Sequence, residues 1–159
     1  KSEFGPSRDL HDIKKDLIKA KEQLSNTFGD SVIDCFVPPW NRIREDIIPN
    51  LSELGFSGFS SFGRRSSNVH ESNLKWFNTH VDVIDWRNTR QFIGRDAMIS
   101  QITDNLRRQR TRSGTSEPVG VLTHHLNMIE SDWEEFRNIF TVLKKNNAVR
   151  FVDPLELFH

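Results

Sequence analysis

NTHVDVIDWR, residues 78–87, interleaves Val and Ile with two acidic side chains and ends on a tryptophan and an arginine. Residues 78–84 are typical of a buried strand, because β-branched side chains pack well on a pleated surface. A second stretch, VGVLTHH at residues 119–125, predicts another strand that runs into two histidines. Folds with parallel strands place their functional sites just after the strand ends, so both stretches are candidate sites.

Helical and strand-like segments alternate along the rest of the chain. Apolar residues at helical spacing predict helices at residues 7–28, 42–54 and 95–110. Gly29 is expected to end the first helix, and Pro49 to split the second. A capping box, Ser131-x-x-Glu134, predicts the start of a fourth helix, and Pro154 predicts the start of a short last one. Short apolar runs predict strands at residues 32–37, 56–62, 78–84, 119–123 and 149–152, with loops at 63–75 and 113–118. The alternation predicts an α/β fold with a mainly parallel sheet, either open or part of a (β/α) barrel.

Length and composition describe an ordinary globular chain. Its 159 residues predict a single domain spanning residues 1–159. Lysine and arginine number 22 and aspartate and glutamate 22, so the charge gives no support for nucleic-acid or membrane binding. No apolar run approaches the roughly 20 residues that span a bilayer. The single cysteine, Cys35, excludes an internal disulfide and a multi-thiolate zinc site. The sequence leaves the cellular compartment and the oligomeric state open.

Three strand-end segments follow one another along the chain: VPPW at residues 37–40, DVIDW at residues 82–86 and LTH at residues 122–124. They resemble, in the same order, the Arg-x-Pro-aromatic loop, the Asp-x-x-Asp-Trp segment and the Leu-x-His strand end of polysaccharide (NodB-type) deacetylases. The last two motifs fit fully. In the first, Val37 stands where the family usually has an arginine, and Arg42 is the candidate substitute for that charge.

The resemblance implies a fold, an activity and a cofactor. The chain would be the C-terminal part of a distorted (β/α) barrel, in a metal-dependent hydrolase that removes N-acetyl groups from a carbohydrate. In the family an Asp-Asp pair supplies the catalytic base and a metal ligand, and a His-x-x-x-His pair also binds the divalent metal, with zinc expected. Neither motif occurs in these residues. We therefore expect the metal ligands in an N-terminal part that precedes residue 1, and none among His11, His70, His80, His124, His125 and His159.

The resemblance also implies roles for single residues. Hydrolysis of an N-acetyl amide needs an acid to protonate the departing amine. His124 matches this acid, and Asp82 would accept a hydrogen bond from it and fix its orientation. Leu122 and Trp86 would line the pocket of the acetyl methyl group, and Trp40 would flank the sugar. With an N-acetylated carbohydrate as the partner, substrate contacts are expected at Trp40, Arg42, Asp85, Trp86 and Leu122.

Each of these features also has another interpretation. Asp82 and Asp85 could cap a turn, the tryptophans could pack in a core, and His80-x-Asp82 could be a metal pair or simply hydrogen-bonded. The arginine-rich run at residues 107–112 favours a nucleic-acid binder, although cations at a helix C-terminus also complement the helix dipole. A chain without its metal-binding half also fits a non-catalytic carbohydrate-binding or interaction remnant.

Overall fold

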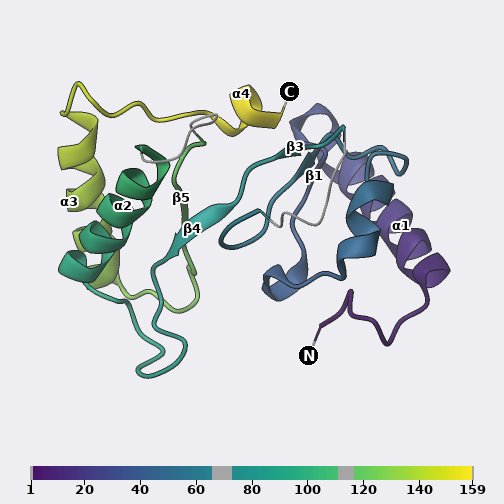
Figure 1. The fold of residues 1–159 in the computed structure, drawn as a ribbon, viewed down its shortest axis with the longest axis horizontal. Coiled ribbons are helices and arrows are strands. Elements are labelled where there is room, and N and C mark those ends of the chain that lie inside the picture. The colour runs from purple at the N-terminus through teal and green to yellow at the C-terminus, as the bar shows by residue number, and fades with distance from the viewer. Residues whose placement is uncertain (1, 66–72, 111–116, 159) are drawn as a thin grey trace. The chain divides into compact units, whose positions relative to one another are not determined.

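The structure, a computed structural model, describes residues 2–65, 73–110 and 117–158 (Figure 1). The chain forms two compact units. The first consists of Lys1–Asn78 and Asp153–His159, and the second of Thr79–Val152. Each unit combines helices with a small parallel sheet, and neither sheet closes into a barrel among the described residues. The predicted α/β class with parallel strands is thus confirmed.

Short strands and helices alternate along both units. In chain order the elements are α1 (Leu10–Phe28), the 3-10 helix η1 (Gly29–Ser31), β1 (Cys35–Phe36), the 3-10 helices η2 (Pro39–Asn41) and η3 (Glu45–Asn50), β2 (Gly58–Phe59), β3 (Lys75–Trp76), β4 (Thr79–Asp82), α2 (Arg95–Arg110), β5 (Gly120–Leu122), α3 (Glu130–Lys144) and α4 (Pro154–Phe158). Within the described residues, none of the helices is both long and apolar enough to cross a membrane.

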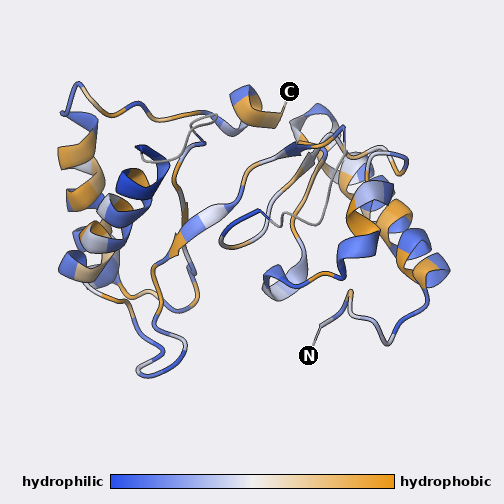
Figure 2. Cartoon of the chain, viewed as in Figure 1, coloured by the Kyte–Doolittle hydropathy of each residue, from blue (hydrophilic) through white to orange (hydrophobic). Residues whose placement is uncertain are grey.

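Helix α1 contributes an apolar stripe to the core of the first unit. Asp9 caps its N-terminus, where the carboxylate accepts a hydrogen bond from the His11 amide at 2.7 Å. Ile13 and Leu17, one turn apart, are buried, and Figure 2 shows apolar orange alternating with polar blue along the helix. Gly29 follows the last turn with a φ of 55°, a conformation that other residues adopt at a cost. The predicted helix and its glycine cap are confirmed.

Three short parallel strands, in the order β1-β2-β3, form the sheet of the first unit. Phe59 on β2 is fully buried, and its ring meets Trp76 of β3 edge to face with the centroids 4.8 Å apart. Because all three strands run the same way, their carboxyl ends open on one edge of the sheet. The other buried members of this core are Phe4, Ile13, Leu17, Ile47, Ile48, Leu51 and Leu74.

Helix α4 belongs to the first unit, although the whole second unit precedes it in the sequence. Its Phe158 lies against Gly58 of β2, where an added Cβ would overlap the phenyl ring. The Phe158 carbonyl accepts a hydrogen bond from the Ser57 hydroxyl at 3.1 Å, and its ring meets Phe77 with the centroids 5.7 Å apart. A glycine at position 58 is therefore required by the close approach of the C-terminal segment.

The second unit is built around the parallel pair β4 and β5 (Figure 1). Val81 and Val83 are fully buried, and they share a core with Met98 of α2 and Ile139 of α3. The fourth predicted helix is confirmed as α3, and it contributes a mainly aromatic stripe. Its members pack against this core from α3: Trp133, Phe136, Phe140 and Leu143.

Some local predictions are wrong. Pro49 does not split a helix; it lies inside the 3-10 helix η3. Ser131 does not cap α3, because the helix already begins at Glu130 and the Asp132 carboxylate accepts the Ile129 amide at 3.0 Å. Strand β3 begins at Lys75, the last residue of the predicted loop at residues 63–75.

The predicted strand at residues 149–152 is also absent from the described structure. Its Phe151 packs on Phe140 of α3, with the ring centroids 5.6 Å apart, and no other strand pairs with this segment. Several predicted features lie outside the described residues. They are most of the loops at 63–75 and 113–118, Thr111 and Arg112 of the arginine-rich run, and His70 and His159.

We predict that Gly58→Ala lowers the free energy of unfolding by about 1–3 kcal/mol, because the new methyl group meets the Phe158 ring. Urea unfolding followed by circular dichroism measures this difference. In a Phe158→Ala background the same substitution should cost much less, since the ring is gone. Equal costs in the two backgrounds would contradict the contact.

Candidate functional site

Two parallel strands bring the predicted acid and its partner together. Strands β4 and β5 pair with Asp82 opposite Leu122, and His124 follows two residues further along the chain. The His124 Nε2 and the Asp82 Oδ1 lie 3.0 Å apart, with 25% and 21% of the two side chains exposed. The predicted contact between these residues is confirmed, and the catalytic role of His124 stays a prediction.

Asp82 accepts hydrogen bonds from three directions. Besides facing His124, its Oδ1 accepts the Ile84 amide at 3.0 Å, and its Oδ2 accepts the Trp86 indole N–H at 2.9 Å. An ionised carboxylate only accepts, so we assign the proton between the two side chains to the His124 Nε2. The His124 Nδ1 then remains available, since it has no hydrogen-bond partner among the described residues.

The Trp86 indole forms a wall beside this pair. Its ring meets the His124 ring at an interplanar angle of 85°, with the centroids 4.8 Å apart. The hydrogen bond to Asp82 fixes the indole, while 44% of the residue stays exposed. A half-exposed indole with a satisfied N–H is the kind of surface on which a sugar ring packs. Leu122, opposite Asp82 on β5, is partly buried.

Asp85 caps the turn that follows β4. Its carboxylate accepts the amides of Arg87 and Asn88 at 3.2 and 3.1 Å, and the Asn88 side chain at 3.0 Å. The hydrogen bond from the Asn88 side chain, ahead of those from the backbone, holds the pKa of Asp85 below its ordinary value. Asp85 therefore stabilises the turn that carries Trp86. A contact between Asp85 and substrate stays a prediction.

His80 occupies a β-bulge that the sequence did not predict. Thr79 pairs with Gly120 and Val81 with the next residue of β5, Val121. His80 therefore has no pairing partner on β5. Its Nδ1 accepts a hydrogen bond from the Gly120 amide at 3.3 Å. Burial lowers the pKa of His80, against a smaller raising effect of Glu117. His80 therefore stabilises the strand register as a neutral side chain. The only signal in the sequence for a role of His80 was its spacing from Asp82.

Trp40 and Arg42 belong to the first unit, whereas the cluster around Asp82 belongs to the second. Trp40 is 66% exposed and has a φ of 54°. Asn41 has the same φ, and each non-glycine residue in this left-handed region costs about 1–2 kcal/mol. Arg42 lines a pocket of the first unit. The contacts of Trp40 and Arg42 with a sugar stay predictions.

No group of three or more His, Cys, Asp or Glu side chains that could hold a metal ion occurs in the described part of the chain. His80 and Asp82 already use the imidazole Nδ1 and both carboxylate oxygens in hydrogen bonds. The cluster offers instead a hydrogen-bonded pair that can hold and transfer a proton beside an aromatic wall. No family model, curated protein or solved structure matches this chain.

We predict that neutral His124 carries its proton on Nε2, because that nitrogen faces an acceptor. Long-range ¹H–¹⁵N NMR at mildly alkaline pH distinguishes the two tautomers. Asp82→Ala should remove the preference, and the exposed His125 serves as an internal reference with mixed tautomers. A His124 protonated on Nδ1 in the unaltered protein would contradict the assigned geometry.

We also predict that stability declines as the pH falls below about 6.5, the ordinary pKa of histidine. The unfolded chain binds a proton at His80 near that pH, whereas the folded chain binds it only at lower pH, because burial lowers the pKa of His80. His80→Gln should flatten this dependence in urea unfolding measured across the acid range. His125→Gln, at an exposed position, should not. An unchanged profile in His80→Gln would rule out His80 as its source.

Proposed function

We propose that this chain is the C-terminal part of a carbohydrate N-deacetylase, in which His124 protonates the departing amine. One observation carries the proposal: His124 and Asp82 form a hydrogen-bonded pair at the carboxyl ends of adjacent parallel strands, with Trp86 beside them. Parallel α/β folds place their catalytic groups at this position. The order of the DVIDW and LTH segments, which resembles that of polysaccharide deacetylases, supports the same conclusion.

Each residue of the cluster has a task in this reaction. Water attacks the acetyl carbonyl carbon and gives a proton to a base that we place outside the described residues. The C–N bond then breaks readily only if the nitrogen gains a proton as it leaves. Asp82 holds His124 through Nε2, so the protonated imidazole presents its Nδ1–H to that nitrogen. Trp86 and Leu122 border the space for the acetyl methyl group. The products are acetate and a sugar with a free amine.

In this proposal, the ligands of the metal that the resemblance implies lie outside the described residues. A bound divalent metal, zinc in this proposal, would supply an activated water molecule. The described residues do not form a site for it, so we place its ligands outside them and assign no step to it. The fold in this proposal is the distorted (β/α) barrel that such enzymes share, and the parallel pairing of the strands within each sheet is consistent with it.

We predict that His124→Ala lowers kcat for acetate release from an N-acetylated oligosaccharide about 10²- to 10⁴-fold, because the proton donor is lost. The assay uses the whole natural protein that contains this chain, with zinc added. KM should change little, since His124 acts on the leaving group. A full rate in His124→Ala would refute the assignment.

His125→Ala is the matched control, because His125 is the next residue along the chain and is exposed. Its rate should equal that of the unaltered protein. Asp82→Asn should shift the pH–rate profile, because the side chain that faces the His124 Nε2 loses its negative charge.

A second candidate function is carbohydrate binding without hydrolysis. The exposed indoles of Trp40 and Trp86, at 66% and 44%, favour it, because exposed aromatic rings are suited to packing on sugars. Saturable binding of an N-acetylated oligosaccharide with no acetate release, in the whole protein with zinc, would favour this function over the first.

A further inference from the structure

A pocket of about 370 Å³ opens in the first unit at the carboxyl ends of its strands. Residues 41–45, which follow β1, line it together with Ser61 and Arg64, which follow β2. Phe59 and Trp76 underlie it, and with 0% and 6% of their surface exposed they offer a ligand almost no area for contact. The volume falls within the range of small-molecule sites, and parallel sheets bind ligands at this edge.

Three arginines line this pocket, Arg42, Arg44 and Arg64. Arg44 is neutralised by Asp46, to which its Nε and Nη2 donate at 2.7 and 2.6 Å. Arg64 has no hydrogen bond or ion pair with any residue that the structure describes. Glu45 is the single carboxylate among the described lining residues, so the pocket carries a net positive charge.

The loop that carries Arg64 is held by a buried side chain. Asn78 is 5% exposed, and its Oδ1 accepts the Ser61 amide at 2.9 Å and the Trp76 indole N–H at 2.7 Å. Its Nδ2 donates to the Gly63 carbonyl at 2.9 Å. The backbone beside Arg64 is therefore fixed before a ligand arrives, which lowers the ordering cost of binding.

We propose that this pocket binds a small ligand through an oxyanion, either a carboxylate or a phosphate ester, with Arg64 as the main contact. A guanidinium group matches such oxyanions because two parallel N–H bonds reach two oxygens. Arg44 shapes the wall, and Arg64 supplies charge that no described residue compensates. The proposal does not depend on the deacetylase proposal, since every lining residue belongs to the first unit and the proposed acid to the second.

The test is isothermal titration calorimetry of the full chain at low ionic strength with three probes: D-glucuronate, D-glucose 6-phosphate and neutral D-glucose. We expect saturable binding of at least one anion and none of glucose. Arg64→Ala should weaken that binding about tenfold, because one charge-assisted contact is lost. Arg64→Lys keeps the charge but cannot form two parallel N–H bonds, so it should weaken the binding less than Arg64→Ala does.

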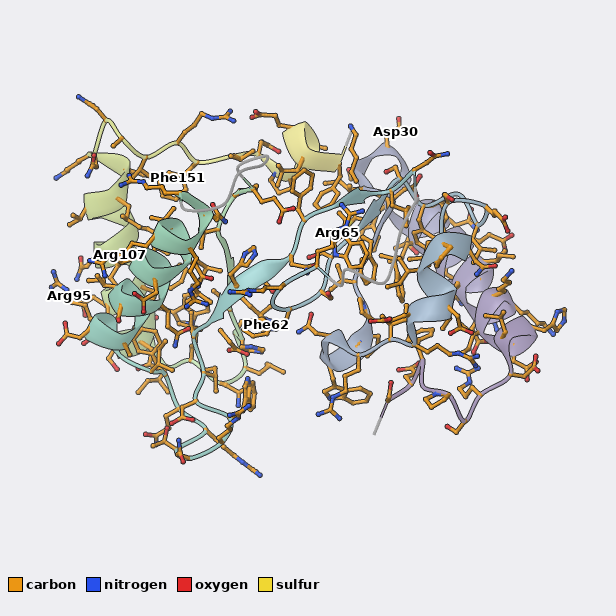
Figure 3. All side chains as sticks on the ribbon, viewed as in Figure 1. Asp30, Phe62, Arg65, Arg95, Arg107 and Phe151 are labelled. Atoms are coloured by element: carbon orange, nitrogen blue, oxygen red, sulfur yellow. The ribbon has the colours of Figure 1, made fainter. Side chains whose placement is uncertain are left out.

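Arg95→Ala is the matched control, because it removes the same charge from an exposed position on α2 (Figure 3). It should leave the affinity unchanged. Binding of glucuronate alone assigns a carboxylate ligand, and binding of glucose 6-phosphate alone assigns a phosphate. The proposal is overturned if neither anion binds saturably, if glucose binds as well as the anions, or if a folded Arg64→Ala binds as tightly as the unaltered protein. Should Arg64→Ala unfold, Arg64→Gln is judged by the same criteria.

Discussion

The carboxylate of Asp82 holds together the candidate site of the second unit. It joins the backbone at Ile84, the indole of Trp86 and the imidazole of His124, so one side chain ties together the end of β4, the turn after it and the segment after β5. Hydrogen bonds to a charged group are about twice as strong as those between neutral groups. The orientation of the proposed acid is therefore set by the same contacts that order the strand ends.

The register of β4 against β5 decides whether those contacts can form. If His80 paired regularly with Val121 instead of forming a bulge, Val81 rather than Asp82 would lie opposite Leu122. A shift of one residue moves every side chain of a strand to the other face. The bulge at His80 is stabilised by the hydrogen bond from the Gly120 amide. His80 therefore positions Asp82, although His80 itself lies outside the cluster.

Sequence patterns predicted the helices more closely than the strands, because helical periodicity and caps are local signals. Helix α2 was predicted at its observed bounds, whereas the strands are two to four residues long and depend on partners distant in sequence. The pairing of Asp82 with His124 followed from motifs at two strand ends. The bulge at His80 depends on register, and the pocket beside Arg64 gathers two separate segments, so no spacing in the sequence revealed either.

The packing of Phe158 on Gly58 also bears on the order in which the chain can fold during synthesis. Ser57 and Phe158 share a hydrogen bond across 101 positions, and contacts of such long range form late. The second unit draws its core from one unbroken stretch, which leaves the ribosome before α4 does. The first unit is therefore completed only after the second has been synthesised, and Gly58 stays uncovered until α4 has emerged.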